Sequence, residues 1–511
     1  MKTNYIRLSV LIFFFMMIKA YPQQNYSRIL SSPDHQFCSN AVETSNNEMI
    51  FFANYTQKSN GGELTYNSCY ALLVKVNASG DSVASRIFME GGDFTYYSRI
   101  LKVENNEFIA IGTGCNVLMP NPFVNYKVLY TRFNENLEIM EQKSIMYYEQ
   151  TNTFSSDPRV IINNENQIIV VEQRKNQYPY VTCFKLTIDG DSIASYSLLP
   201  PSYSIFGDIV QKPDYTGYYL TFDGEWDIYE PYSESTIIEV DNDFNYISKD
   251  SLPANIGSHN QIRQFNSSTY ITGGQAFRVF TPSISPPMPW ITQEYCIEKL
   301  GLDLKATKQA FLCPLDKIED TIYSAANLQN FDFIDTNNIY SVYVREYLVI
   351  FPAVYNYLVI ARLNTNLDVK WQYFYGFEAY YHPYAIYATS DGGCFFIGQR
   401  YDYQNQDEEK DLFYVKIDSS GLFLPNKKLS PIVHSAILYP NPGKDLVYIQ
   451  SGPQVNGALM QLFDISGKPI AEQRIDATLL QLPVQNLPKG VYPWRIVLNN
   501  KVVDSGKWVK E

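Results

Sequence analysis

A short acidic stretch beside an aromatic residue is the clearest candidate for chemistry in this sequence. Asp223, Glu225, Trp226 and Asp227 follow a strand-like run within five positions of one another. Two carboxylates can act as general acid and base on a glycosidic bond, and an aromatic ring beside them can stack on a sugar. The same composition also suits a solvated loop. We therefore treat the stretch as part of a candidate ligand surface, with the solvated loop as the alternative.

Tyrosine supplies the second candidate surface. The chain contains 42 tyrosines, and several of them cluster between residues 373 and 387. A tyrosine side chain has a flat apolar face and one hydroxyl group, a combination that suits recognition of glycans or proteins. Tyr380 and Tyr381 complete the candidate ligand surface. The alternative is that these rings pack between neighbouring structural units.

Motifs of known catalytic and metal sites are absent from the sequence. No two of the four histidines lie within one helical turn, and neither the HExxH, GxSxG, GxGxxG nor P-loop pattern occurs. Asp241 to Asp243 has the alternating oxygen ligands that calcium prefers, but it falls at an expected turn between strands. We predict no catalytic residue, no cofactor and no metal site. Whether the protein is an enzyme stays open, with a non-enzymatic role favoured.

The charge and the cysteines narrow the choice of partners. The chain has 40 basic and 53 acidic residues, a formal net charge of -13, and no block of lysine or arginine. Nucleic acid and anionic membrane surfaces are therefore poor candidate partners. The seven cysteines lie far apart without a CxxC pair. One or two disulfides are compatible with export, but the pattern is not that of a disulfide scaffold.

The first twenty residues predict export. Lys2 and Arg7 precede an apolar run from Leu8 to Ile18, and the small residue Ala20 follows. This is the layout of a signal peptide, which we place at residues 1–20. The run has about eleven residues, fewer than the roughly 20 of a membrane-spanning helix, and no comparable run follows. We predict no transmembrane helix, with an uncleaved N-terminal anchor as the alternative.

The elements that must position the candidate side chains repeat along the chain. Residues 74–85 and 184–195 are identical at six of twelve positions, and the same pattern recurs with an average spacing of about 57 residues. Such a period marks a repeat architecture. The equivalent positions of the seven copies are mostly basic: Lys75, Arg132, Lys185, Glu239, Lys299, Arg362 and Lys416. We expect these side chains at a solvated outer edge that discourages pairing with other chains.

Each copy has the composition of two β-hairpins. The residue two positions after the basic position is usually a turn former, as in Asn77, Asn134 and Asp418, and a second pair of apolar runs precedes it. Four antiparallel strands per copy match the size of a propeller blade. We predict an all-β fold with a seven-bladed β-propeller over residues 28–424. A β-solenoid is the structural alternative, although its coils are usually shorter.

A second, smaller unit follows the repeats. The period stops at a proline-bounded polar stretch, and we place a linker at residues 425–436. Six strand-like runs then follow within about 80 residues. Short strands of this number and spacing predict a small Ig-like β-sandwich over residues 437–511.

Four motifs in this unit have a recognisable order. They contain Tyr439, Pro440, Asn441 and Pro442, then Asp464, Gly467 and Lys468, then Leu487, Gly490 and Tyr492, and finally Gly506 and Lys507. Together they resemble the type A C-terminal sorting domain of the type IX secretion system. The one departure is Pro493, where the family continues an unbroken strand. Because proline lacks the backbone donor of a sheet, we expect an edge strand or a bulge there.

The resemblance implies a protein of the Bacteroidota that is exported through the type IX secretion machinery. Members are commonly cleaved near the domain boundary, and are then released or tethered to surface lipopolysaccharide. The preceding region resembles the divergent seven-repeat propellers that often accompany such domains. We therefore expect a secreted or outer-membrane surface-attached propeller that binds a glycan or a protein. The alternatives are a secreted hydrolase acting on polysaccharide or peptide at a propeller active site, and a structural component of the envelope.

Overall fold

The fold was analysed in a computed structural model of the full chain. The structure describes residues 25–30, 35–56, 69–88, 92–117, 123–151, 158–174, 180–199, 205–223, 235–252, 256–280, 290–312, 321–326, 328–347, 356–376, 379–401, 410–421, 427–429, 436–439, 443–451, 455–477, 479–499 and 501–510. The predicted signal peptide at residues 1–20 lies outside these ranges. Within them, no helix is long and apolar enough to cross a membrane.

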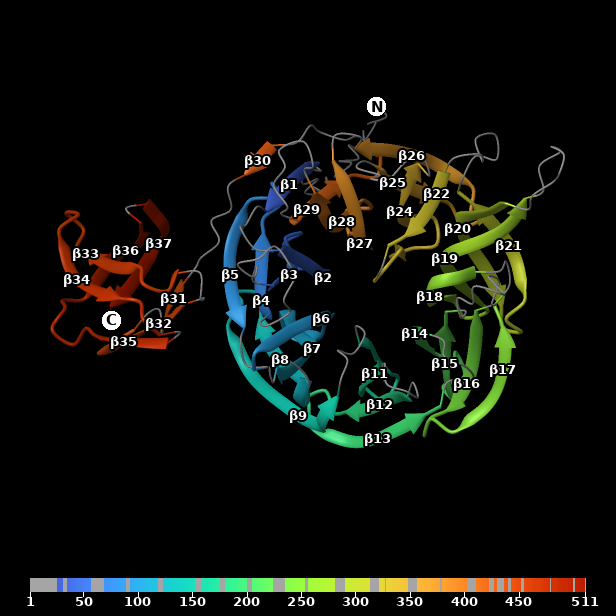
Figure 1. The fold of residues 1–511 in the computed structure, drawn as a ribbon, viewed down its shortest axis with the longest axis horizontal. Coiled ribbons are helices and arrows are strands. Elements are labelled where there is room, and N and C mark those ends of the chain that lie inside the picture. The colour runs from blue at the N-terminus through green and yellow to red at the C-terminus, as the bar shows by residue number, and fades with distance from the viewer. Residues whose placement is uncertain are drawn as a thin grey trace, which may run out of the picture.

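Residues 26–417 form a ring of antiparallel sheets (Figure 1). The first sheet has eight strands, and a single parallel pair between Cys69 and Phe94 joins its two halves. The first half contains β2 (His35–Glu43), β3 (Met49–Thr56), β4 (Cys69–Val76) and β5 (Ser82–Phe88). The second half contains β6 (Phe94–Lys102), β7 (Glu107–Val117), β8 (Phe123–Asn134) and β9 (Ile139–Thr151), with the 3-10 helix η1 (Glu104–Asn106) between β6 and β7.

Four sheets continue the ring. The first two contain β10 (Arg159–Ile162), β11 (Ile168–Arg174), β12 (Tyr180–Leu186) and β13 (Ser192–Leu198), then β14 (Phe206–Gln211), β15 (Gly217–Phe222), β16 (Thr236–Asp241) and β17 (Tyr246–Ser251). The next two contain β18 (Ile256–Asn266), β19 (Thr269–Phe280), β20 (Trp290–Gly301) and β21 (Ala306–Phe311), then β22 (Thr321–Ala325), β23 (Phe331–Phe333), β24 (Ile339–Tyr347), β25 (Asn356–Leu363) and β26 (Val369–Gly376). Burial falls from the middle of a sheet to its last strand: β15 is buried at every position and β17 is exposed at every position.

The two ends of the ring region meet in one sheet. This sheet contains β27 (Tyr380–Ala388), β28 (Cys394–Tyr401), β29 (Lys410–Ile417), β1 (Tyr26–Leu30) and β30 (Lys427–Leu429). β1 pairs antiparallel with β29, so the start of the chain supplies the fourth strand of the last sheet and closes the ring. The Tyr414 hydroxyl reinforces the closure by donating to the Gly80 carbonyl at 3.0 Å.

The predicted all-β propeller fold is confirmed. When the eight-stranded sheet is divided at its single joining pair, the described strands group into seven similar units around the ring (Figure 1). The blade count of seven stays a prediction, and this grouping agrees with it. The predicted start of the propeller at residue 28 falls inside β1, and the predicted linker 425–436 contains the short strand β30.

The turn after the third strand of each unit has the same conformation throughout the described ring. A polar residue opens the turn in most copies, and Asp241 is one example: its carboxylate accepts the backbone N–H groups of Asp243 and Asn245, both at 2.8 Å. One residue of each turn then adopts positive φ, between 58° and 81°: Gly80, Leu137, Gly190, Phe244, Leu304, Leu367 and Gly421. The interpretation of Asp241 to Asp243 as a turn agrees with this geometry.

The predicted outer edge of basic residues is wrong. The repeated basic positions lie on third strands, and the side chains of Lys75, Lys185 and Lys416 are only 12%, 10% and 8% exposed. Several of them reach a turn of the following unit, as Arg132 does when it pairs with Asp189 at 2.7 Å. The alternation of residues along a strand predicts the face on which a side chain lies, but not which residues of the next sheet contact it. Arg132, Lys185, Lys299 and Arg362 therefore join neighbouring units, whereas Lys75 and Lys416 pair with Glu48 and Asp391 of their own units.

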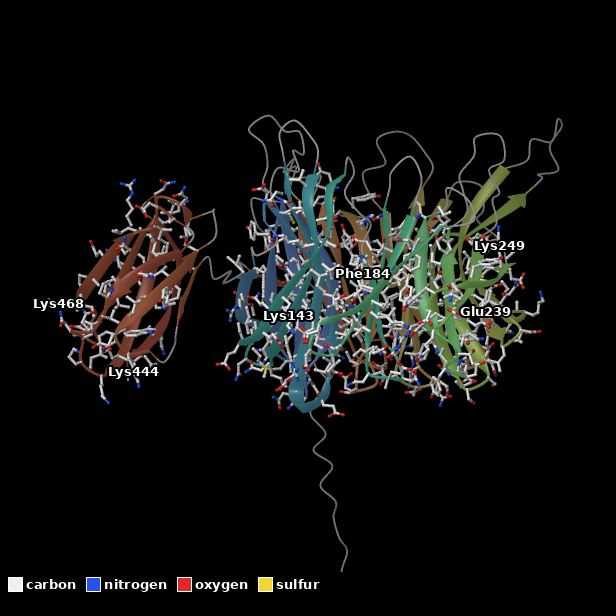
Figure 2. The ribbon with its side chains drawn as sticks, turned by 90° about the horizontal axis from the view of Figure 1, so that it is seen from below. Lys143, Phe184, Glu239, Lys249, Lys444 and Lys468 are labelled. Carbon is white, nitrogen blue, oxygen red and sulfur yellow. The ribbon has the colours of Figure 1, made fainter. Side chains whose placement is uncertain are left out.

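The two ends of the ring differ. Figure 2 shows the strands running between these ends. Because neighbouring strands are antiparallel, the turns between first and second strands and between third and fourth strands lie at one end, which we call the turn face; β16 and β17 are joined there by residues 242–245. The opposite end, the connection face, is where second strands end and third strands begin. There β15 and β16 are separated by residues 223–235, and β3 and β4 by residues 57–68.

The C-terminal unit is a two-sheet β-sandwich. One sheet contains β31 (Ala436–Tyr439), β32 (Leu446–Ser451) and β35 (Leu479–Pro483). The other contains β34 (Pro469–Arg474), β33 (Leu459–Phe463), β36 (Gly490–Leu498) and β37 (Lys501–Lys510). Their shared core includes Trp494 and the fully buried Trp508. β36 lies between β33 and β37, so Pro493 does not mark an edge strand; its position falls just beyond the residues that pair with β33.

Candidate functional site

The acidic part of the predicted ligand surface lies on the connection face. Asp223 directly follows β15 and is buried, and its backbone N–H donates to the Ile205 carbonyl at 2.7 Å. Glu225, Trp226 and Asp227 lie outside the described residues. The structure therefore shows that this stretch begins at the connection face. The role of the stretch in ligand binding stays a prediction.

The two predicted tyrosines lie on opposite faces of β27. Tyr381 is 2% exposed, its ring meets Phe413 edge-on at 5.3 Å, and its backbone N–H and carbonyl both bond the Asn356 side chain at 2.7 Å. Tyr380 is half-buried and lines a pocket. Successive strand residues alternate between faces, which accounts for the separation. Tyr381 thus packs between sheets, whereas Tyr380 lines the pocket.

The pocket encloses about 200 Å³ at the connection face of the last sheet. Its rim follows the strand register, because Tyr380 pairs with Tyr401, and Tyr401 pairs with Lys410. One step deeper, His382 pairs with Gln399. The lining residues come from β27, β28 and β29: Tyr380, His382, Tyr384, Gln399, Tyr401 and Lys410. Three adjacent strands therefore hold the lining in fixed relative positions.

The pocket lies at the junction where the ring closes. Ile397 and Leu412 belong to a buried cluster that also contains Phe51 and Leu72 from the first sheet. Gln399 and Lys410 each stand two positions from one of these core residues, so they lie on the same face of their strands. The pocket wall thus faces the first sheet, at the seam between the beginning and the end of the ring.

A second group of polar side chains occupies the centre of the ring. It consists of Arg99, Arg159, Asp208, Arg263 and Asp332, from the innermost strands of five different units. Arg263 and Asp332 form an ion pair, and the Arg263 guanidinium lies 4.7 Å from the centroid of the Phe333 ring. Sequence reasoning missed this group.

Residues 328–330 lie inside this centre. The side chain of Arg159 donates to the Leu328 carbonyl at 2.9 Å, and Arg99 donates to the Gln329 side chain at 3.4 Å. Gln329 also pairs with Ala385 of β27. These partners belong to strands on different sides of the ring, so the segment lies across the central channel. The innermost strand of its own unit is accordingly divided into β22 and β23.

Burial changes the protonation chemistry of this central group. Burial raises the pKa of Asp208, and the nearby Arg159 and Arg99 oppose that rise. Burial also lowers the pKa of Arg263 to about 10, although 38% of its side chain is exposed. Arg263 therefore stays cationic at neutral pH. Carboxylates that lie among arginines are better suited to stabilise contacts between units through charge attraction than to act as general acids or bases.

The described residues contain no group of three or more His, Cys, Asp or Glu side chains that could hold a metal ion. Five cysteines are buried: Cys69, Cys115, Cys183, Cys296 and Cys394. Burial raises the pKa of Cys394 to about 12 and that of Cys115 also to about 12, so these thiols are poor nucleophiles at neutral pH.

A sequence signal for the central group did exist. Arg99, Arg159 and Asp208 each stand four positions before the residue that opens the first turn of their unit, at Val103, Asn163 and Lys212. A charged residue at this position in three consecutive copies would have indicated a shared location. The pocket had no comparable signal, because its wall depends on the register of three strands and on ring closure.

The C-terminal unit matches a known family. Residues 437–511 match the family model of the secretion system C-terminal sorting domain. This match confirms the resemblance to the sorting domain of the type IX secretion system. The protein is therefore an exported protein, secreted or attached to the cell surface, and the type IX secretion machinery is its export partner.

The sorting motifs have structural roles in the sandwich. Asp464 caps a turn by accepting the Ser466 and Lys468 backbone N–H groups at 2.9 and 3.0 Å, with Gly467 at φ +83°. The Tyr492 hydroxyl donates to the Pro488 carbonyl at 2.5 Å. A Cβ atom at Gly506 would lie 2.5 Å from the Trp494 ring. Pro440, Asn441 and Pro442 lie outside the described residues.

The whole chain resembles several solved structures at low identity. The β-propeller domain of the Trilobed protease from Pyrococcus furiosus has 9% identity and a TM-score of 0.39, over 74% of this chain and 95% of that chain. A mutant NanB sialidase from Streptococcus pneumoniae has 12% identity and a TM-score of 0.38, over 78% of this chain and 71% of that chain. PorZ, a surface component of the type IX secretion system of Porphyromonas gingivalis, has 10% identity and a TM-score of 0.27, over 94% of this chain and 70% of that chain. These scores are too low to assign an activity or a ligand, and no curated protein matches the chain.

Proposed function

We propose that this protein is a binding or adhesion propeller that contacts a glycan or a protein through its connection face. The sorting domain exports it, and release or tethering to surface lipopolysaccharide, after removal of a signal peptide at residues 1–20, belongs to the same proposal. The proposed domain division is a propeller at 28–424, a linker at 425–436 and the sorting domain at 437–511.

One observation carries the proposal: an aromatic pocket opens at the connection face. Tyr380, Tyr401 and Lys410 stand at the ends of their strands at this face. The turn face, in contrast, repeats one turn conformation around the described ring. Binding residues are commonly carried by variable connections on a rigid scaffold. The ring provides such a scaffold, and the pocket gives its connection face a shape that a ligand can recognise.

The central carboxylates favour binding over hydrolysis. Asp332 is ion-paired with Arg263, and Asp208 accepts the backbone N–H groups of Ile209 and Ile262 at 3.0 and 3.2 Å. A glycosidase needs one carboxyl group to donate a proton and a second to act as base or nucleophile. Residues 328–330 also take up part of the space that a substrate would occupy in the channel.

The test uses the full mature protein on arrays of glycans and host proteins. We expect a saturable signal that Trp226→Ala weakens about tenfold or more, because a buried aromatic contact dominates many binding surfaces. Glu165→Ala, on the turn face, is the control and should leave the signal unchanged. Folded protein that gives no signal on either array, or that cleaves an array glycan, would contradict the proposal.

A further inference from the structure

We propose that the pocket at the ring seam binds one neutral hexopyranose residue of a glycan. The proposal rests on the binding function proposed for the connection face, and it adds the class of ligand and the residues that hold it. Five features support it: the size of the pocket, its aromatic walls, its hydrogen-bonding groups, the charge of the adjoining sequence and the rigidity of its floor.

The size of the pocket limits the ligand to a single ring. Sites for drug-sized ligands usually enclose about 300 to 1,000 Å³. The pocket encloses about 200 Å³, so it accommodates one ring and not an extended ligand. Since the lining ends at the rim formed by Tyr380, Tyr401 and Lys410, the rest of a longer glycan would extend into solvent over the connection face.

The walls offer flat aromatic faces. Tyr380 and Tyr401 are cross-strand neighbours at the rim, and Tyr384 lies deeper, where its ring meets His382 edge-on at 5.2 Å. The axial C–H groups of a pyranose form an apolar face that stacks on such rings. A tyrosine wall suits this contact better than an aliphatic wall, because each ring also carries a hydroxyl group at its edge.

The polar groups suit the hydroxyl groups of a sugar. The Gln399 amide can donate and accept, the His382 ring carries two nitrogen atoms, and the Lys410 ammonium donates. Sugar hydroxyl groups also both donate and accept, so their chemistry matches that of these side chains. Lys410 is exposed, while Gln399 is only 3% exposed, so the polar groups span the depth of the pocket.

The charge of the adjoining sequence selects a neutral sugar over an acidic one. Residues 402–411 contain one lysine and five carboxylates: Asp402, Asp407, Glu408, Glu409 and Asp411. The whole chain also has a formal net charge of -13. A single ammonium group does not offset this surplus, so a uronic or sialic acid would be repelled by the surrounding field.

The pocket floor is rigid, which favours binding of a small ligand. Tyr384 is 7% exposed and belongs to the same buried cluster as Phe395 and Leu412. Backbone hydrogen bonds also fix this region, because the Tyr384 carbonyl accepts from the N–H groups of Leu328 and Gln329 at 2.9 and 3.1 Å. A preorganised site loses little conformational entropy when its ligand binds.

The experiment measures binding of single sugars to the full mature protein by saturation-transfer NMR and calorimetry. The neutral probes are the methyl glycosides of glucose, galactose, mannose and N-acetylglucosamine, and the acidic probes are glucuronic acid and N-acetylneuraminic acid. Tyr401→Ala removes a pocket wall, Tyr401→Phe keeps the ring, and Tyr380→Ala removes a second wall from another strand. Tyr246→Ala, at a tyrosine 61% exposed on β17, is the matched control.

We expect at least one neutral sugar to bind, with affinity reduced about tenfold by Tyr401→Ala and by Tyr380→Ala, and less than about threefold by Tyr401→Phe and Tyr246→Ala. Tighter binding of the acidic probes, or neutral binding that neither alanine variant weakens, would overturn the inference. Array binding that depends on Trp226 but not on these tyrosines would overturn it while leaving the proposed function intact. Absence of both array binding and sugar binding would overturn both.

Discussion

Replacement of one buried carboxylate should remove part of the pH dependence of propeller stability. Glu298, on β20, is fully buried, and Gln309 donates to its Oε1 at 2.5 Å. Among the described residues, its Oε2 has no hydrogen-bond partner. Burial raises the pKa of Glu298 from 4.5 to about 7, and the hydrogen bond from Gln309 opposes this rise. The folded protein therefore keeps a proton that the unfolded chain releases.

The sign and size of the effect follow from this difference. Between pH 4.5 and about 7 the folded state binds more protons, so the stability contributed by Glu298 is present at low pH and lost as pH rises through 7. Each unit of pKa corresponds to about 1.36 kcal/mol, so the loss between pH 4.5 and 8.5 is about 3 kcal/mol. Glu298→Gln keeps the side-chain shape without a charge. We expect this variant to be about 3 kcal/mol more stable than the wild type at pH 8.5 and nearly equal at pH 4.5.

Urea unfolding monitored by tyrosine and tryptophan fluorescence, repeated across this pH range, measures the difference. Glu472→Gln is a matched control, because Gln461 also donates to Glu472 at 2.5 Å across two strands, but on an exposed surface of the sorting domain. That substitution should not change the pH profile. If Glu298→Gln follows the wild-type profile, or is less stable than the wild type at pH 8.5, the assignment of a buried, protonated carboxyl group is refuted.

Three further predictions concern the channel, the seam and export. Arg159→Met removes a half-buried cation that donates hydrogen bonds to two carbonyl groups, and should lower the free energy of unfolding by about 3 kcal/mol in urea titrations. Gly80→Ala places a Cβ 2.3 Å from the Tyr26 ring and should speed amide exchange in β1, with a cost of about 2 kcal/mol. Gly467→Ala, also at positive φ but with no atom within 4 Å, should cost less. Deletion of residues 437–511 should leave the protein inside the cells, as an immunoblot of cell and medium fractions will show.

The sequence predicted those parts of the fold that depend on local chemistry. Turn residues such as Asn77 and Asp241 recur at a fixed spacing, and their side chains cap turns wherever they occur. The strands of the sorting domain were equally predictable, since six strand-like runs were expected after the linker and the structure has the strands β31 to β37 there. Local hydrogen bonding and alternation of apolar residues are sufficient for such predictions.

Features that depend on distant segments could not be predicted in this way. The closing strand β1 is separated from its partner β29 by more than 380 residues along the chain. The five residues of β1 contain no motif that indicates this partner. Arg132 was expected at a solvated edge, yet it meets Asp189 of the following unit. The wall of the pocket likewise needs the register of Tyr380 against Tyr401, which a bulge near Pro383 shifts along the strand.

The contrast between the two ends of the ring explains how one scaffold can carry a specific site. At the turn face, each described unit has a residue at positive φ, and a Cβ added at Gly80 or Gly190 would lie within 3 Å of a ring of the preceding unit, so substitution there disturbs packing between units. At the connection face, lengthening a loop costs only about 0.6 kcal/mol for each doubling of its length. Connections such as residues 224–234 and 402–409 can therefore change in length at little cost to the ring, and the row Tyr380, Tyr401 and Lys410 takes its positions from the three strands that carry it. A ligand site is thus expected at the end of the ring where the packed strands meet connections whose length is not constrained. The pocket opens at this end, the connection face.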